Sequence, residues 1–162
     1  MFIQVNNLNK SFHNEPVLKN IHVSIGEGET VAIIGPSGAG KSTFLRTLNG
    51  LEKPTSGEII IDGMAVTSPD TDLQKVREKV GMVFQQFNLF KHMTVIDNVA
   101  YGLIRVKNVP KEEARSRALT YLDRVGLKDK ANRYPHELSG GEKQRVAIAR
   151  TLAVEPKVIF FD

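Results

Sequence analysis

One glycine-rich segment constrains the fold of this chain more than any other part of its sequence. The residues Val31–Ile34 are all apolar, the segment from Gly35 to Gly40 interrupts them, and Ser42–Leu48 then repeats apolar residues at helical spacing. This order predicts a buried strand, a loop and a helix. We therefore expect an α/β fold in which the loop joins the end of a strand to the start of a helix.

The glycine loop also fits the pattern G-x-x-x-x-G-K-[ST] from Gly35 to Ser42. Glycines let successive backbone N–H groups turn inward around a phosphate, and the following helix adds the positive end of its dipole. Lys41 can then reach the β and γ phosphates, and the Ser42 hydroxyl can bind Mg²⁺. The residues expected to hold the nucleotide here are Gly35, Ser37, Gly38, Ala39, Gly40, Lys41, Ser42 and Thr43.

The last segment suggests a second element of the same chemistry. Val158–Phe161 is an apolar run, as expected of a parallel strand covered on both faces, and Asp162 follows it. Apolar strands often end in Asp because Asp suits turns, so the motif is weak alone. Together with the glycine loop it predicts a carboxylate that holds Mg²⁺.

Two interpretations fit the segment Leu138–Glu142, which opens the last expected helix. Ser139 and Glu142 form the S-x-x-E pattern of a capping box, which explains them structurally. A capping box needs no glycine, however, and Gly140 and Gly141 each cost about 1 kcal/mol of helix propensity relative to Ala. If this helix end also binds phosphate, the two glycines would let the ligand approach the backbone closely.

The rest of the chain divides into a part rich in strand signals and a part without them. Short apolar or alternating runs continue to about residue 85, and helical spacing replaces them from about residue 86 to 137. We expect a helical insertion inside an α/β framework. The expected strands are Phe2–Val5, Ile21–Ile25, Glu58–Asp62 and Val80–Phe84, and the expected helices are Asp72–Lys79, two in the insertion around Val95–Val106 and Ala114–Val125, and Ser139–Ala153.

Composition limits the class of protein and its partners. The 162 residues are 41% hydrophobic and can bury one substantial core. The chain has no cysteine for a disulfide or thiolate metal site, and no apolar run that could span a bilayer, so any membrane association must come through a partner. Basic and acidic residues are interleaved despite the net charge of +4, so nucleic acid is not expected. The four histidines lack zinc-type spacing and are expected at the surface: His13, His22, His92 and His136.

Taken in order, these motifs resemble the nucleotide-binding subunit of ABC transporters over the whole chain. Gly35–Thr43 resembles Walker A, Gln85 the Q-loop glutamine, Leu138–Glu142 the signature motif, and Val158–Asp162 Walker B. Phe12 resembles the aromatic residue that stacks on adenine. That role depends on the family match, because a lone aromatic residue is otherwise a core or surface residue.

The resemblance implies a P-loop NTPase core of the ABC ATPase type, with an N-terminal antiparallel β subdomain and an inserted helical subdomain. It divides residues 1–162 into the β subdomain and P-loop core at 1–85, the helical subdomain at 86–137, and the signature helix with the Walker B strand at 138–162. The segments Phe84–Phe90 and Arg133–Gly141 resemble importers of polar amino acids. Glu142-Lys143 departs from the Gln-Gln frequent in that group.

The resemblance also implies a mechanism that uses ATP and Mg²⁺. Phe12 stacks on adenine, and Lys41 with the loop amides holds the phosphates. The expected Mg²⁺ ligands are Ser42, Gln85 and, through water, Asp162, and the expected catalytic residues are Lys41, Gln85 and Asp162.

A second chain completes the site in this scheme. Ser139, Gly140 and Gly141 of one chain cap the γ-phosphate bound by the other, which gives a head-to-tail homodimer around two ATP molecules. Its closure drives a transmembrane permease subunit, so the chain is expected on the cytoplasmic face of the membrane as a peripheral protein. An extracytoplasmic solute-binding protein is an indirect partner.

The family places a Glu directly after the Walker B Asp, and no residue follows Asp162 here. We therefore expect the C-terminal part of the core to be missing, and hydrolysis to be poor because that carboxylate activates the attacking water. A non-hydrolytic nucleotide-binding module is one alternative. A soluble ABC ATPase acting with nucleic acid is another, against which the short helical insertion and Tyr134-Pro-His argue. A small-molecule kinase would have no use for the Ser139 motif.

Overall fold

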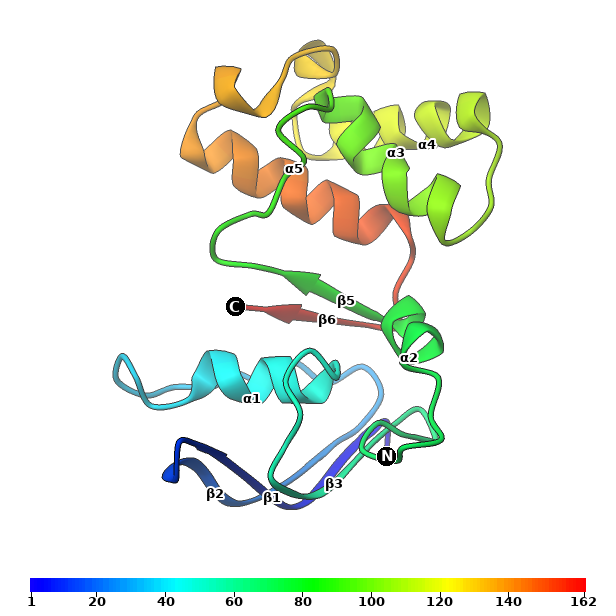
Figure 1. Cartoon of the computed structure of the whole chain (residues 1–162). Coiled ribbons are helices and arrows are strands. Elements are labelled where there is room, and N and C mark those ends of the chain that lie inside the picture. The colour runs from blue at the N-terminus through cyan, green and yellow to red at the C-terminus, as the bar shows by residue number, and fades with distance from the viewer. The chain divides into compact units, whose positions relative to one another are not determined.

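The computed structural model describes all 162 residues, and the chain divides into two compact units. The first unit spans Met1–Arg77 and the second spans Glu78–Asp162. Figure 1 shows the first unit in blue, cyan and green and the helices of the second unit in green to orange-red. Each unit has its own buried residues.

An antiparallel sheet of four strands forms one side of the first unit. Its strands are β1 (Ile3–Phe12), β2 (Glu15–Ile25), β3 (Ser56–Ile61) and β4 (Met64–Ala65), in the order β2-β1-β3-β4. Alternate residues of β1 and β3 point into the core, including Ile3, Val5, Ile59 and Ile61, each at most 1% exposed. The expected strands at Phe2–Val5, Ile21–Ile25 and Glu58–Asp62 are confirmed, and the first two extend well beyond the residues that the sequence indicates.

Both hairpins of this sheet turn on two residues with positive φ. His13 and Asn14, at φ 46° and 67°, join β1 to β2, and Asp62 and Gly63, at φ 48° and 76°, join β3 to β4. This backbone matches the right-handed twist of the flanking strands, which is why such two-residue turns are favoured in hairpins. The turn predicted at Asp62-Gly63 is therefore confirmed.

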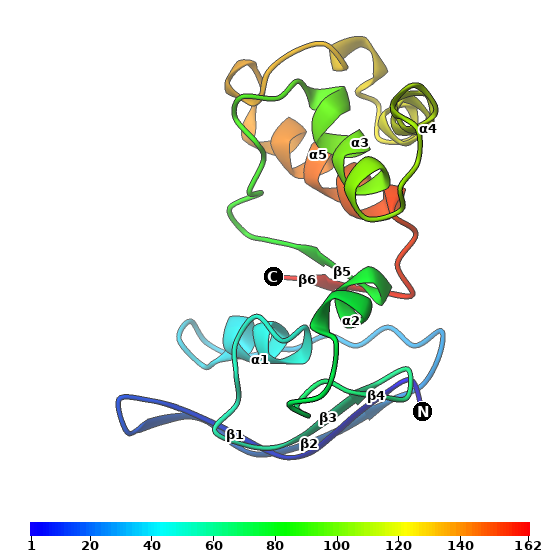
Figure 2. The same cartoon turned by 45° about the vertical axis from the view of Figure 1, so that its right-hand side comes forward.

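Helix α1 (Lys41–Leu48) lies along one face of this sheet, as both views show (Figures 1 and 2). It buries Phe44, Leu45 and Leu48, the three apolar residues whose spacing predicts the helix. Helix α2 (Leu73–Lys79) follows β4 and buries Val76. Both helices confirm the sequence predictions.

The expected strand at Val31–Ile34 is wrong. These residues are not part of any strand, and Val31, Ile33 and Ile34 are 53%, 41% and 93% exposed. The sheet of the first unit does not include them, so no ladder of hydrogen bonds holds the segment. An apolar run predicts a buried strand only where a neighbouring strand exists to pair with it.

The second unit combines a short parallel sheet with a group of helices. Strands β5 (Val80–Val83) and β6 (Val158–Phe161) pair in parallel, with Val80 opposite Val158 and Val83 opposite Phe161. Helix α5 packs closely on β5, since a Cβ at Gly81 would lie 2.6 Å from Thr151 Cγ2. Phe160 is buried, but Phe161 is 61% exposed, so the prediction that this strand is covered on both faces is wrong. The side chains of a strand alternate between its faces, and one face is left open here.

The helices α3 (Val95–Arg105), α4 (Lys111–Arg124) and α5 (Gly140–Ala153) share one hydrophobic core. Two short 3-10 helices, η1 (Lys128–Lys130) and η2 (Pro135–Glu137), connect α4 to α5. From residue 86 to 137 the regular elements are α3, α4, η1 and η2, with no strand among them. None of the helices in the structure combines the length and the apolar character that crossing a bilayer needs.

Candidate functional site

Two glycines with left-handed backbone angles lie in the loop that precedes α1. Gly38 and Gly40 have φ angles of 82° and 87°, a conformation that costs residues with a Cβ about 1–2 kcal/mol. Gly40 also lies against β2, where an added Cβ would sit 2.9 Å from Val17 Cγ1. The position therefore needs glycine both for its backbone angle and for the close approach of β2.

Lys41 folds back over its own loop. Its Nζ donates hydrogen bonds to the carbonyl oxygens of Gly35 and Pro36, at 2.8 and 2.7 Å. The loop thus curls around the ammonium group and closes into a compact turn. Lys41 belongs to the first turn of α1, so its charge and the positive end of the helix dipole lie at the same place.

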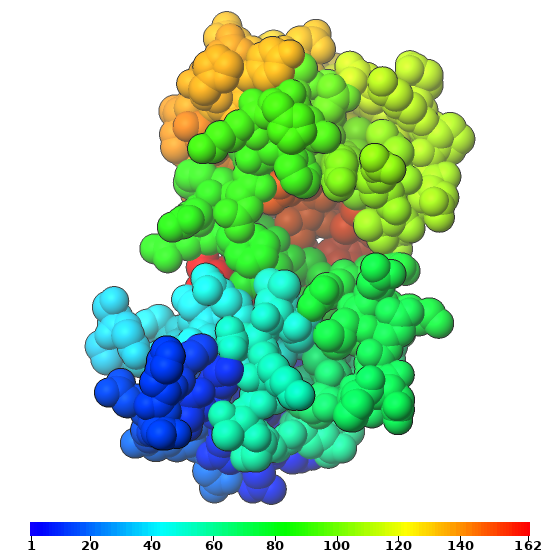
Figure 3. All heavy atoms as spheres, viewed as in Figure 1, coloured from blue at the N-terminus to red at the C-terminus, as the bar shows by residue number.

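The loop keeps most of its backbone donors available. The amide of Ala39 donates to Pro36 O, whereas the amides of Ser37, Gly38 and Gly40 donate to no backbone carbonyl. The segment is exposed, and Figure 3 shows the light-blue and cyan region at the surface of the first unit. Unused N–H donors, a lysine and a helix N-terminus are the groups that bind a polyphosphate, so the donor set fits ATP.

Phe12 lies at the end of β1, beside the turn of the first hairpin, and is 39% exposed. Figures 1 and 2 place this turn and the glycine loop at the same end of the first unit. The Nζ of Lys10 lies 4.5 Å from the centroid of the Phe12 ring. The sequence predicts Phe12 as a site residue but misses Lys10, because the register of β1 shifts between Lys10 and Ser11 and simple alternation does not place the two side chains.

Gln85 and Asp162 follow neighbouring strands of the second unit. Gln85 comes two residues after β5, Asp162 comes directly after β6, and the Asp162 amide donates to Val83 O at 3.0 Å. The carboxyl ends of parallel strands are where α/β proteins bind ligands. Gln85 and Asp162 therefore both follow the carboxyl ends of β5 and β6, at the same end of this sheet.

Ser139 caps α5 as the sequence predicts. Its Oγ accepts a hydrogen bond from the Glu142 amide at 3.3 Å, and its own amide donates to Glu142 Oε2 at 2.8 Å. Lys130, in η1, forms an ion pair with Glu142 Oε1. The hydrogen bond from Lys130, followed by the one from the Ser139 amide, lowers the pKa of Glu142 to about 2. The capping box is confirmed.

The capping box does not explain the two glycines that follow it. A Cβ at Gly140 would meet no atom within 4 Å, and one at Gly141 would only reach Arg145 Nη1 at 4.0 Å. Neither glycine has positive φ. Packing and backbone angle within the chain therefore leave room for alanine at both positions. The open space above them is consistent with the second interpretation, a backbone surface left bare for a ligand.

The predicted site residues fall in both units. Phe12 and the loop residues from Gly35 to Thr43 belong to the first unit, and Gln85, Ser139–Gly141 and Asp162 belong to the second. No group of three or more His, Asp or Glu side chains gathers anywhere in the chain to form a metal centre. A Mg²⁺ ion that is already coordinated by phosphate oxygens needs only one or two oxygen ligands from the protein. The lack of such a cluster is therefore compatible with binding of Mg-ATP.

Comparison with known families gives one match that covers most of the chain. The model of the ABC transporter family matches residues 18–162. The arginine transport ATP-binding protein ArtM of Bacillus subtilis is 55% identical over 160 residues, and the glutamine transport ATP-binding protein GlnQ of Escherichia coli is 52% identical over 160 residues. Each alignment covers 99% of this chain and 67% of the relative, so the chain spans about two thirds of their length.

Solved structures give the same fold. The dimeric structure of MJ0796, a bacterial ABC transporter cassette, superimposes with a TM-score of 0.91 at 44% identity. A post-hydrolysis state of the same ATP-binding cassette, bound to ADP and Pi, gives a TM-score of 0.90. Both alignments cover 99% of this chain and 73% of the other chain. The fold class expected from the sequence, the P-loop NTPase core of the ABC ATPase type, is confirmed.

Proposed function

We propose that this chain, which belongs to the ABC transporter family, serves as the ATP-binding motor subunit of an importer for polar amino acids. One observation carries the proposal: a lysine, a helix N-terminus and free backbone amides converge on one exposed glycine loop. The names of the relatives support the substrate class, because they are ATP-binding proteins for arginine and glutamine transport.

In this proposal Lys41 exchanges its two loop carbonyls for the β and γ phosphates of ATP. The exchange is favourable because phosphate oxygens carry full charge and form shorter, stronger hydrogen bonds with an ammonium group than carbonyls do. Ser42, Gln85 and Asp162 are the residues that would hold Mg²⁺. A bound ion would neutralise the charge that develops on the transferred phosphoryl group.

The proposal assigns the Ser139 end of α5 to the γ-phosphate of a second chain. The open space above Gly140 and Gly141 supports this role, since no contact within the chain uses it. The dimeric form of the MJ0796 cassette supports a paired arrangement. A head-to-tail homodimer would place such a helix end over each ATP, and its closure would be the mechanical step.

The partners of the proposed motor are a transmembrane permease subunit and, indirectly, an extracytoplasmic solute-binding protein. A chain whose helices cannot cross a bilayer would reach the membrane through the permease. The proposed location is therefore the cytoplasmic face of the membrane, where ATP is available.

Calorimetric titration with Mg-ATP tests the nucleotide-binding part of the proposal. We expect saturable binding by the chain and a loss of about ten- to hundredfold in affinity for Lys41→Ala, because hydrogen bonds to charged groups contribute about 1.5–3 kcal/mol. Lys19→Ala is the control, since Lys19 is an exposed lysine of β2 in the same unit. Equal affinities for the chain and Lys41→Ala would refute the assignment of the loop.

A further inference from the structure

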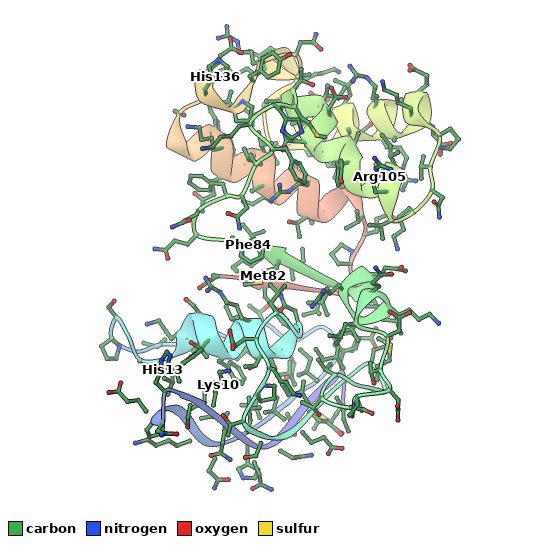
Figure 4. The ribbon with its side chains drawn as sticks, in the orientation of Figure 1. Lys10, His13, Met82, Phe84, Arg105 and His136 are labelled. Carbon is green, nitrogen blue, oxygen red and sulfur yellow. The ribbon has the colours of Figure 1, made fainter.

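Lys10 covers one face of the Phe12 ring. The two residues are two positions apart on β1, and the register of the β1-β2 ladder shifts between Lys10 and Ser11. Lys10 Nζ lies 4.5 Å from the ring centroid, a distance at which a cation is attracted by the π-system. Lys10 is 9% exposed, whereas Phe12 is 39% exposed. Figure 4 shows Lys10 on the inner part of the first unit, close to the hairpin turn marked by His13.

The ammonium group is held in this position by two further partners. Its Nζ donates to Glu52 Oε1 at 2.5 Å and to Lys53 O at 2.7 Å, both in the segment after α1. A lysine with two fixed acceptors and little exposure has lost most of its rotamer freedom in the folded state. The contact with the ring is therefore a built feature of the unit.

The hairpin fixes the backbone position of Phe12. Phe12 pairs with Glu15 in the last rung of the β1-β2 ladder, and the two-residue turn of His13 and Asn14 closes the hairpin directly beyond it. With the backbone and one face of the ring both fixed, the opposite face is the one left for another planar group.

We propose that Lys10 is a positioning residue for the nucleotide base: it fixes the orientation of the Phe12 ring and keeps one face covered, so that adenine stacks on the other. This inference rests on the proposed function, because it takes Phe12 as the base-stacking residue. The ammonium also draws the π-electrons of the ring toward itself, which favours stacking of an electron-rich base on the far face. Lys10 touches no part of the nucleotide.

The test separates the base from the phosphates by comparing two ligands, Mg-ATP and Mg-tripolyphosphate, in calorimetric titrations of the whole chain. Both ligands use the glycine loop, and only ATP uses the ring. We expect Lys10→Met to weaken ATP binding by about three- to thirtyfold, the range of cation–π contacts, and to leave tripolyphosphate binding unchanged. Phe12→Leu, which removes the ring, should weaken ATP binding at least as much, and Lys10→Met should have no further effect in that background.

Two variants separate positioning of the ring from simple tethering. Glu52→Gln removes the ion pair with Lys10 but leaves the cation over the ring, so it should keep the ATP affinity within about twofold. Lys19→Met is the matched control on β2, since it removes an exposed lysine of the same sheet. Lys10→Gln retains a hydrogen-bond donor for Glu52 and Lys53 O while removing the charge. It should reproduce the effect of Lys10→Met, and it serves if the latter does not fold.

The possible outcomes are distinct. Selective loss of ATP affinity in the Lys10 variants supports the inference. Equal loss in Glu52→Gln and the Lys10 variants, equal loss of both ligands, or no loss at all would overturn it and leave Lys10 as a tether between β1 and the segment after α1. Failure of the unmodified chain to bind either ligand would instead reject the proposed function, and the inference with it.

Discussion

Asn98 is the buried polar residue whose loss should cost the second unit most. It lies on α3 with 0% of its surface exposed and accepts a hydrogen bond from the Phe90 amide at 2.8 Å. Its side-chain amide donates to the carbonyl oxygens of Phe90, Met93 and Thr94 at 3.1, 3.2 and 3.0 Å. One side chain therefore holds the whole turn that precedes α3.

The cost of Asn98→Ala follows from which partners keep a second hydrogen bond. Phe90 O still accepts from the Met93 amide, and Thr94 O still accepts from the amide of residue 98, so both carbonyls stay satisfied. The Phe90 amide loses the acceptor and Met93 O loses the donor that Asn98 provides, and an unsatisfied buried polar group costs about 1–3 kcal/mol. Adding about 1 kcal/mol for the net worth of the remaining bonds gives a loss of about 2–4 kcal/mol.

Urea unfolding followed by far-UV circular dichroism measures this loss directly. The control is Asn132→Ala, an exposed asparagine of the same unit, for which we expect a change within about 0.5 kcal/mol. A destabilisation by Asn98→Ala no larger than that of the control would show that the turn does not depend on the Asn98 side chain, and the reasoning from buried hydrogen bonds would fail.

Three further perturbations follow from single contacts. Gly40→Ala should lower the free energy of unfolding more than Gly38→Ala, as measured by urea titration. The added Cβ at residue 40 would lie 2.9 Å from Val17 Cγ1, whereas the one at residue 38 would meet no atom within 4 Å. Arg150→Met should cost about 1–3 kcal/mol in urea and speed hydrogen exchange near residues 87 and 88, whose carbonyl oxygens its guanidinium holds; unchanged exchange would contradict this. The fold lowers the pKa of Glu142 from 4.5 to about 2, so ionised Glu142 stabilises the folded chain fully above pH 4.5 and progressively less toward pH 2. The melting temperatures of the chain and of Glu142→Gln should therefore converge as the pH falls.

Local patterns predicted the elements whose partners lie close in sequence. The spacing of apolar residues located α1, the S-x-x-E pattern located the cap of α5, and the Asp62-Gly63 pair located a hairpin turn. Each of these depends on residues within one turn of helix or one hairpin. The glycine loop was predictable for the same reason, because its donors and its helix are contiguous in the chain.

Contacts between distant segments were not predictable from one sequence. The apolar run at Val31–Ile34 predicts a strand, but a strand needs a hydrogen-bonded neighbour that a linear pattern does not reveal. The hydrogen bonds from Arg150 to the segment after Gln85 join residues about sixty positions apart, and the ion pair of Lys130 with Glu142 joins two different helices. The contact of Lys10 with Phe12 is local, but the register of β1 shifts between Lys10 and Ser11, so simple strand alternation does not predict it.

Hydrogen exchange of the whole chain with and without Mg-ATP tests the central claim most directly. We expect slower exchange of the amides of residues 37–43 on nucleotide binding at any protein concentration. We also expect slower exchange of residues 139–142 that grows with protein concentration, because a second chain supplies that contact. Unchanged exchange of residues 37–43 at saturating Mg-ATP would contradict the claim that this loop and the start of α1 bind the triphosphate.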